Sequence, residues 1–169
     1  MFDIKDCIEY HIVSSLYGDK TAKRSGIPLL NHINEGLVIL NEINASELAK
    51  RAYCLHPVLQ DNIALTQNYK QISEFKIDIS VAITTMEYRR VANNYLSKRI
   101  INSIDEIELS PLLDVNDMLI ADKVQNRKDF ELYHLGKHER SDILDQYFKN
   151  WLERLEITEE RYQELIKLL

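Results

Sequence analysis

Apolar residues recur three and four positions apart along most of the chain, and this spacing is typical of one face of an α-helix. The pattern predicts helices over about residues 3–17, 30–43, 44–56, 76–100, 112–127, 141–155 and 158–169. The segment 62–75 is mixed, with room for a short helix, and 104–111 is a connector. The alternation that indicates β-strands is missing almost everywhere. We therefore predict an all-α fold in a single domain, residues 1–169.

Local signals refine two features of this pattern. Asn44, Ser141 and Thr158 precede apolar-periodic segments and are the predicted helix caps. The segment 112–127 is apolar on most of its sides, so it is predicted to be a buried central helix.

Residues 53–62 hold a histidine in an apolar helical run, followed directly by Pro57. A proline inside a helix removes a backbone donor and clashes with the carbonyl four residues back, so the helix is predicted to kink or end near His56. A kink there can turn His56, Gln60 and Asp61 toward one cleft. The alternative is a core histidine, satisfied by its neighbours, just before a helix stop.

Charge and composition narrow the class of protein. The net charge is −6 and no extended basic run occurs, which argues against non-specific binding of nucleic acid. Cys7 and Cys54 are too few for a disulfide framework. No apolar run approaches membrane length and the first residues do not resemble a signal peptide. We expect a soluble protein of the cytoplasm, with no membrane partner.

Three polar residues stand where apolar ones are expected. His32 lies near the start of the second helix, His56 near the end of the third, and Asp122 within the buried segment. A buried carboxylate needs a cation, hydrogen bonds or a metal. Two imidazoles and one carboxylate can bind a divalent metal, whereas the alternative is a buried ion pair between Asp122 and a histidine.

Three segments match the motifs of a known family in order and in approximate separation. Residues 23–32 read KRSGIPLLNH, residues 53–61 read YCLHPVLQD, and residues 118–127 read MLIADKVQNR. They match an RKSGxPYxxHP-like loop, an LLHDxxED segment and a KLADxxxN segment. From about residue 5 to 155, the chain resembles the HD-domain phosphohydrolases, above all the hydrolase domain of RelA/SpoT-type alarmone enzymes and their small stand-alone relatives. The resemblance implies an HD-type helical bundle, here with an extra helix at 158–169.

The resemblance also implies a metal site. The family holds a divalent metal, usually Mn²⁺, with the loop histidine, both residues of the HD pair and the later aspartate, which implies His32, His56 and Asp122 as ligands here. Pro57 replaces the aspartate of the HD pair, so the fourth ligand is missing. Gln60 and Asp61 occupy the positions of the acidic pair that orients water.

The same resemblance implies contacts to a phosphorylated nucleotide. The implied substrate-binding residues are Lys23, Arg24, Lys123, Asn126, Arg127 and Tyr147. Lys23 and Arg24 would hold phosphates, and Asn126 would contact the sugar. The alternative is that these charges are simply solvated and that Tyr147 packs in the core.

Three functions stay open from the sequence. The first is a metal-dependent phosphohydrolase acting on a nucleotide such as (p)ppGpp, with Asp61 orienting the water. The second is a catalytically inactive protein that senses or sequesters a nucleotide, which accounts more easily for Pro57 and Gln60. The third is a helical scaffold that retains only the fold.

Overall fold

Eight α-helices and two short 3-10 turns form the part of the chain that the computed structural model describes, residues 3–23, 25–98, 101–137 and 139–169. The helices are α1 (Ile8–Tyr17), α2 (Leu30–Glu42), α3 (Glu47–Leu59), α4 (Asn62–Glu74), α5 (Ile79–Lys98), α6 (Leu113–Tyr133), α7 (Ser141–Arg154) and α8 (Glu159–Ile166). The 3-10 turns span Ile4–Asp6 and Ile104–Glu106. Within these described ranges the sole β feature is an isolated bridge between Thr21 and Pro28. The all-α prediction is confirmed.

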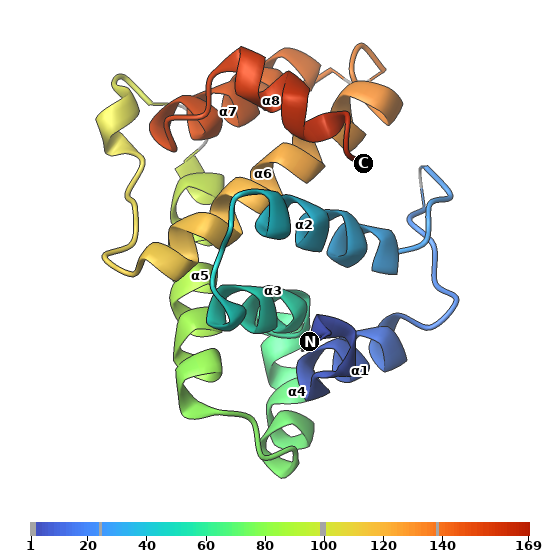
Figure 1. Cartoon of the computed structure of the whole chain (residues 1–169). Coiled ribbons are helices and arrows are strands. Elements are labelled where there is room, and N and C mark those ends of the chain that lie inside the picture. The colour runs from blue at the N-terminus through green and yellow to red at the C-terminus, as the bar shows by residue number, and fades with distance from the viewer. Residues whose placement is uncertain (1–2, 24, 99–100, 138) are drawn as a thin grey trace.

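Helix α3 lies at the centre of the arrangement (Figure 1). It contacts α1, α2, α4, α5 and α6. Helices α7 and α8 pack on α6, at the end of the molecule away from α1 and α4. One hydrophobic cluster runs from Val13 on α1 to Leu165 on α8. A single core therefore joins all parts of the chain, and each large buried side chain contributes about 1.5–3 kcal/mol to it.

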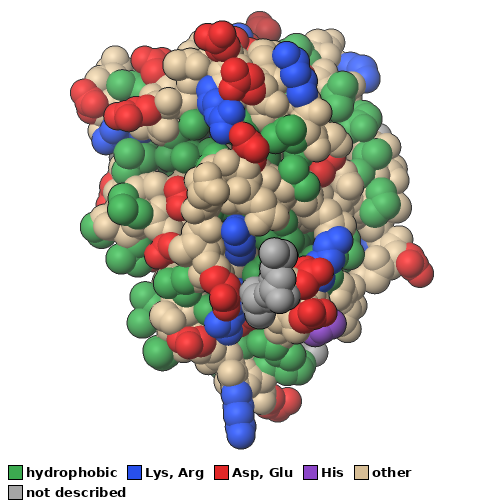
Figure 2. Space-filling model, viewed as in Figure 1, with side chains coloured by type: hydrophobic (Ala, Val, Ile, Leu, Met, Phe, Trp, Pro, Cys, Tyr) green, Lys and Arg blue, Asp and Glu red, His purple; other side chains and the backbone are tan. Residues whose placement is uncertain are grey.

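Acidic and basic side chains are interspersed over the face shown in Figure 2, most densely over α7 and α8. Hydrophobic side chains gather along the edge formed by α5 and the segment that leads into α6, where Ile83, Met86 and Leu113 are exposed. No helix in the described part of the chain is long and apolar enough to cross a membrane.

The predicted caps are confirmed at one of three positions. Thr158 caps α8 by accepting the Arg161 N–H. Asn44 does not cap α3, because it adopts the left-handed region (φ 55°) and the following Ser46 accepts the Ala49 N–H instead. Asn is one of the few residues that tolerates this conformation.

Ser141 does not cap α7 either. It is the first residue of that helix, and its hydroxyl bonds the preceding loop, accepting from the Gly136 N–H and donating to the His134 carbonyl.

Helix α3 does not end at His56, because it runs through Pro57 to Leu59. The other predicted outcome, a kink near His56, stays a prediction. The buried helix 112–127 is confirmed as α6, but it extends two turns further, to Tyr133. Its extra turns carry Phe130, which is buried, and Lys128, whose ammonium binds Glu35 on α2.

Candidate metal centre

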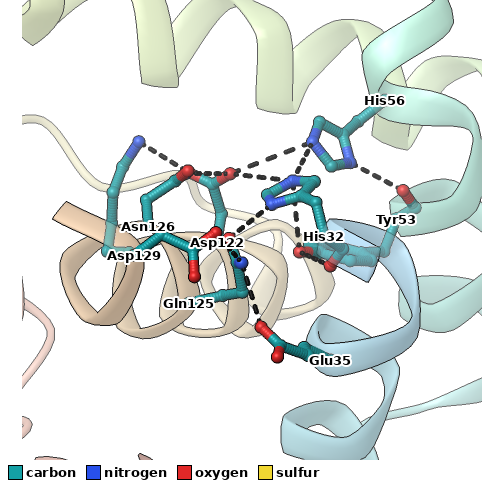
Figure 3. Close-up of polar contacts among 9 residues, drawn as sticks. His32, Glu35, Tyr53, His56, Asp122, Gln125, Asn126 and Asp129 are labelled. Atoms are coloured by element: carbon teal, nitrogen blue, oxygen red, sulfur yellow. Dashed lines mark hydrogen bonds and ion pairs between the residues drawn. The ribbon is translucent and has the colours of Figure 1, made fainter. Parts of the chain in front are cut away.

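His32 from α2, His56 from α3 and Asp122 from α6 bring their side chains to one point (Figure 3). The two Nε2 atoms are 3.2 Å apart. The Oδ1 atom of Asp122 lies 3.5 Å from the Nε2 atom of His32 and 3.9 Å from that of His56. A point about 2.1 Å from all three atoms fits these separations, and metals bind imidazole nitrogen and carboxylate oxygen at about 2.0–2.2 Å.

The tautomer of His56 follows from Pro57. The proline has no N–H for the carbonyl of Tyr53, four residues earlier, and the Nδ1 atom of His56 lies 2.6 Å from that carbonyl oxygen. Nδ1–H therefore donates to Tyr53, which leaves the lone pair of Nε2 facing the other two ligands. Burial lowers the pKa of His56 to about 3, which keeps the ring neutral.

The tautomer of His32 follows from Gln125, on α6. The amide nitrogen of Gln125 donates to Glu35 at 3.0 Å and to Asp129 at 2.8 Å. Because carboxylates only accept, the amide oxygen must face His32, whose Nδ1 lies 2.6 Å away and donates to it. The Nε2 atom of His32 thus also carries a lone pair, and the Tyr53 hydroxyl lies 3.4 Å from it. Lys128 fixes the carboxylate of Glu35, with contacts of 2.6 Å to both oxygens.

Asp122 is almost fully buried and is held by its own helix (Figure 3). Its Oδ2 atom accepts from Lys123 at 2.7 Å, and its Oδ1 atom accepts from Asn126 at 2.8 Å. Burial raises the pKa of Asp122, but Lys123 and the two histidines outweigh burial and lower it to about 2. The ammonium of Lys123 lies over the rings of Tyr147 and Trp151, at 5.8 and 5.4 Å from their centroids.

Three acceptors therefore face one point with none of their own hydrogens between them. Both Nδ1 hydrogens are committed elsewhere, and the Asp122 carboxylate is ionised. A cation at that point, either a metal ion or one additional proton, would offset the repulsion among the three lone pairs.

Two buried tyrosines surround the histidines. Tyr53 lies against both imidazole rings, and its hydroxyl occupies the space that a side chain at Gly36 would fill, since a Cβ there would stand 2.1 Å from it. Tyr88 packs its ring 4.9 Å from that of His56. Burial and the nearby Asp122 carboxylate raise the pKa of Tyr88, which places its hydroxyl beside the centre.

A pocket of about 290 Å³ opens onto the centre. It is lined by Tyr17, Ala22, Ser25, Ile27, Pro28, Leu29, His32, Gln60, Asp122, Gln125, Asn126 and Asp129. The His32 side chain is 21% exposed, whereas those of His56 and Asp122 are 1% and 2% exposed. The centre is thus closed toward the core and open toward this pocket.

The other residues expected at the site are placed in several environments. Gln60 and Asn126 line the pocket. Asp61 caps α4, accepting the Ala64 N–H at 2.7 Å, and is exposed. Lys123 and Tyr147 are buried behind Asp122.

The expected phosphate-binding residues are less concentrated than the resemblance implies. Lys23 is exposed in the loop that carries the Thr21–Pro28 bridge, and Arg24 lies outside the described residues. Arg127 does not appear in the described lining of the pocket. Its guanidinium holds Glu159 and Glu131 and lies 4.0 Å from the ring centroid of Tyr162.

Sequence reasoning missed the residues that orient the ligands. Gln125 lies three positions after Asp122, and Glu35 three positions after His32, so helical spacing puts each beside a ligand. That spacing was the available signal, although it does not show that the two residues bond each other.

Comparisons with models of known protein families, with curated proteins and with solved structures found no match. A function for this chain therefore has to rest on the chemistry of the centre itself.

Proposed function

We propose that this chain is a metal protein of the HD phosphohydrolase type, in which His32, His56 and Asp122 bind Mn²⁺ and the adjoining pocket takes a phosphorylated nucleotide. The observation that carries the proposal is the convergence of three acceptor atoms on one point beside an open pocket. We also propose a cytoplasmic location, supported by the free thiols of Cys7 and Cys54.

The separations favour a metal over a shared proton. One proton satisfies one pair of acceptors, and the 3.2 Å between the Nε2 atoms is at the long end for such a bond. Asp122 lies farther still from both rings. A metal ion satisfies all three acceptors together. With only three protein ligands, the metal ion would keep coordination positions open for water or substrate, as catalytic sites do, whereas structural sites are filled by four protein ligands.

The charge of the centre favours an anionic ligand. Asp122 is the carboxylate of the described ligand group, and Lys123 already offsets its charge. A divalent ion would keep a net positive charge toward the pocket, which attracts phosphate oxygens. When bound, such an ion would polarise a phosphoryl oxygen and acidify a water. Asn126 lines the pocket within reach of a ligand, and Lys23 can approach from the exposed loop.

A nucleotide binder without hydrolytic activity is the second candidate, and one observation favours it. A hydrolase of this type needs a carboxylate to orient water, and Asp61 is committed to capping α4. Gln60 lines the pocket but cannot act as a base. Both candidates bind the metal and the nucleotide, but only the hydrolase would cleave the nucleotide.

The test measures nucleotide binding by calorimetry and phosphate release with guanosine tetraphosphate and guanosine triphosphate, with added Mn²⁺ or with a chelator. Mn²⁺-dependent release identifies the hydrolase, and Mn²⁺-dependent binding without release identifies the binder. Both signals should disappear in His32→Ala. They should persist in His11→Ala, which removes an exposed histidine of α1 that lines a different pocket. If no nucleotide binds below millimolar concentration, the nucleotide proposal is wrong and the scaffold function remains.

A further inference from the structure

Helices α1 and α4 both pack against α3, but they make little contact with each other (Figure 1). A pocket of about 460 Å³ lies between them, within the range of about 300–1,000 Å³ that is typical of small-molecule sites. One wall comes from α1 and the other from α4 and the following Phe75, while the buried Val58 of α3 lies at the base. The pocket is therefore a consequence of how the three helices pack.

Most of the wall of this pocket is apolar. Ile8, Ile12 and Leu16 follow one another at four-residue spacing and so share one face of α1. Ile8 is 38% exposed, and the other two are half-buried. Ile72 and Phe75, also half-buried, line the pocket from the α4 side. A hydrocarbon group that displaces water from these side chains gains free energy from burial.

The polar side chains of the pocket are neutral or basic. Lys20 supplies a positive charge, and its ammonium uses one of three donors on the Leu16 carbonyl, at 2.8 Å. His11 and Ser15 stand one turn apart on the exposed side of α1, and each side chain can donate a hydrogen bond. No carboxylate belongs to the described lining, although the chain carries a net charge of −6. An anionic group in this pocket would thus meet donors rather than like charge.

We propose that this pocket binds a small apolar carboxylic acid. Its hydrocarbon part lies between α1 and α4, over Val58, and its carboxylate lies at Lys20 and His11. The apolar walls account for the hydrocarbon part, and the basic polar set selects an acid over an amine of the same length. Charge-assisted hydrogen bonds from the ammonium fix the orientation of the ligand.

The pocket is separate from the candidate metal centre. The two pockets share none of their described lining residues, and no member of the His32, His56 and Asp122 group lines this one. Binding of the acid needs no metal ion. The experiment is therefore done in the presence of a chelator, and its result does not depend on the proposed function.

The experiment titrates hexanoate, octanoate, octan-1-ol and octylamine into the full chain and follows binding by calorimetry. Octanoate should bind more tightly than the alcohol and the amine, and about fourfold more tightly than hexanoate for each added CH₂ group. The proposal is overturned if octanoate does not bind at millimolar concentration, or if octylamine binds as tightly. It is also overturned if sedimentation shows a dimer that octanoate dissociates, because the pocket would then hold a second copy of the chain.

Variants at the rim locate the bound acid. Lys20→Gln should weaken octanoate binding about fivefold and leave octanol binding unchanged, since it removes one charge. Ser15→Glu adds a carboxylate at the rim and should weaken octanoate binding by a similar factor relative to Ser15→Gln, which has nearly the same shape. Gln146→Glu adds the same charge at an exposed position of α7 and should bind octanoate like the wild type. Equal octanoate affinity in Ser15→Glu and Ser15→Gln, or in Lys20→Gln and the wild type, would contradict the proposed position of the carboxylate.

Discussion

Gln125 orients His32, because its amide nitrogen is held by two carboxylates and its oxygen must accept from the imidazole. Gln125→Leu removes this constraint on the tautomer of His32. Loss of such a partner typically lowers metal affinity about 10- to 100-fold. Calorimetric titration of Mn²⁺ measures the change, and Gln146→Leu, at an exposed position of α7, serves as the control with unchanged affinity.

Gly36 makes room for the hydroxyl of Tyr53. Gly36→Ala gains about 1 kcal/mol of helix propensity, but its Cβ would stand 2.1 Å from that hydroxyl and force a fully buried side chain to move. Overpacking of this kind costs about 1–3 kcal/mol, so we expect a net loss of stability in urea unfolding. Tyr53→Phe is the comparison and should change stability by less than about 1 kcal/mol, since both bonds of the hydroxyl are 3.4 Å long. A more stable Gly36→Ala variant would contradict this packing.

Pro57 has two opposing effects on α3. Pro57→Ala restores a backbone N–H for the Tyr53 carbonyl, so the free energy of unfolding should rise by up to about 3 kcal/mol. The same N–H competes with Nδ1 of His56, and we expect Mn²⁺ affinity to fall about tenfold. Pro57→Asp adds a carboxylate beside the centre and should bind Mn²⁺ more tightly than Pro57→Ala. Equal affinity in the wild type and both variants would mean that neither the tautomer of His56 nor a fourth ligand matters.

At the scale of elements, the segment 62–75, which forms α4, is mixed in its pattern. Apolar spacing, together with the capping signals, predicted the other seven described helices, each of which contacts α3 or α6. It could not predict that α3 continues past Pro57, since a side-chain donor replaces the lost backbone donor there. It also gave the first helix too early a start, because Cys7 is extended (ψ 153°) and caps α1. The exact first and last residues of these helices depend on single hydrogen bonds rather than on the apolar periodicity.

Arg127 attaches α8 to α6. Its buried guanidinium makes two bonds to Glu159, at 2.7 and 3.1 Å, and lies over Tyr162. Arg127→Ala should therefore destabilise the protein by about 2–4 kcal/mol. Arg127→Lys keeps the charge but loses the second bond, so its loss should be smaller. Chemical denaturation measures both variants. Mn²⁺ and nucleotide affinities of the folded Arg127→Ala protein should match the wild type; if they fall, Arg127 binds the ligand as the family resemblance implies.

At the scale of the whole molecule, the centre depends on contacts between residues far apart in the sequence. His32, His56 and Asp122 were identifiable as polar residues in apolar helical surroundings, and the resemblance grouped them. Their tautomers and the closure of the centre toward the core were not identifiable, because they arise from the packing of three helices. Nor did spacing reveal that Asp61 would serve as a cap.

The most direct test of the central claim is a titration of Mn²⁺ into the metal-free protein, followed by calorimetry or equilibrium dialysis. We expect one ion per chain in the wild type and in His11→Ala, and no binding in His32→Ala, whose helical content should stay unchanged by circular dichroism. A wild-type protein that binds no ion below millimolar Mn²⁺ would contradict the metal centre, as would full binding in His32→Ala. The convergence of His32, His56 and Asp122 would then be a buried ion pair.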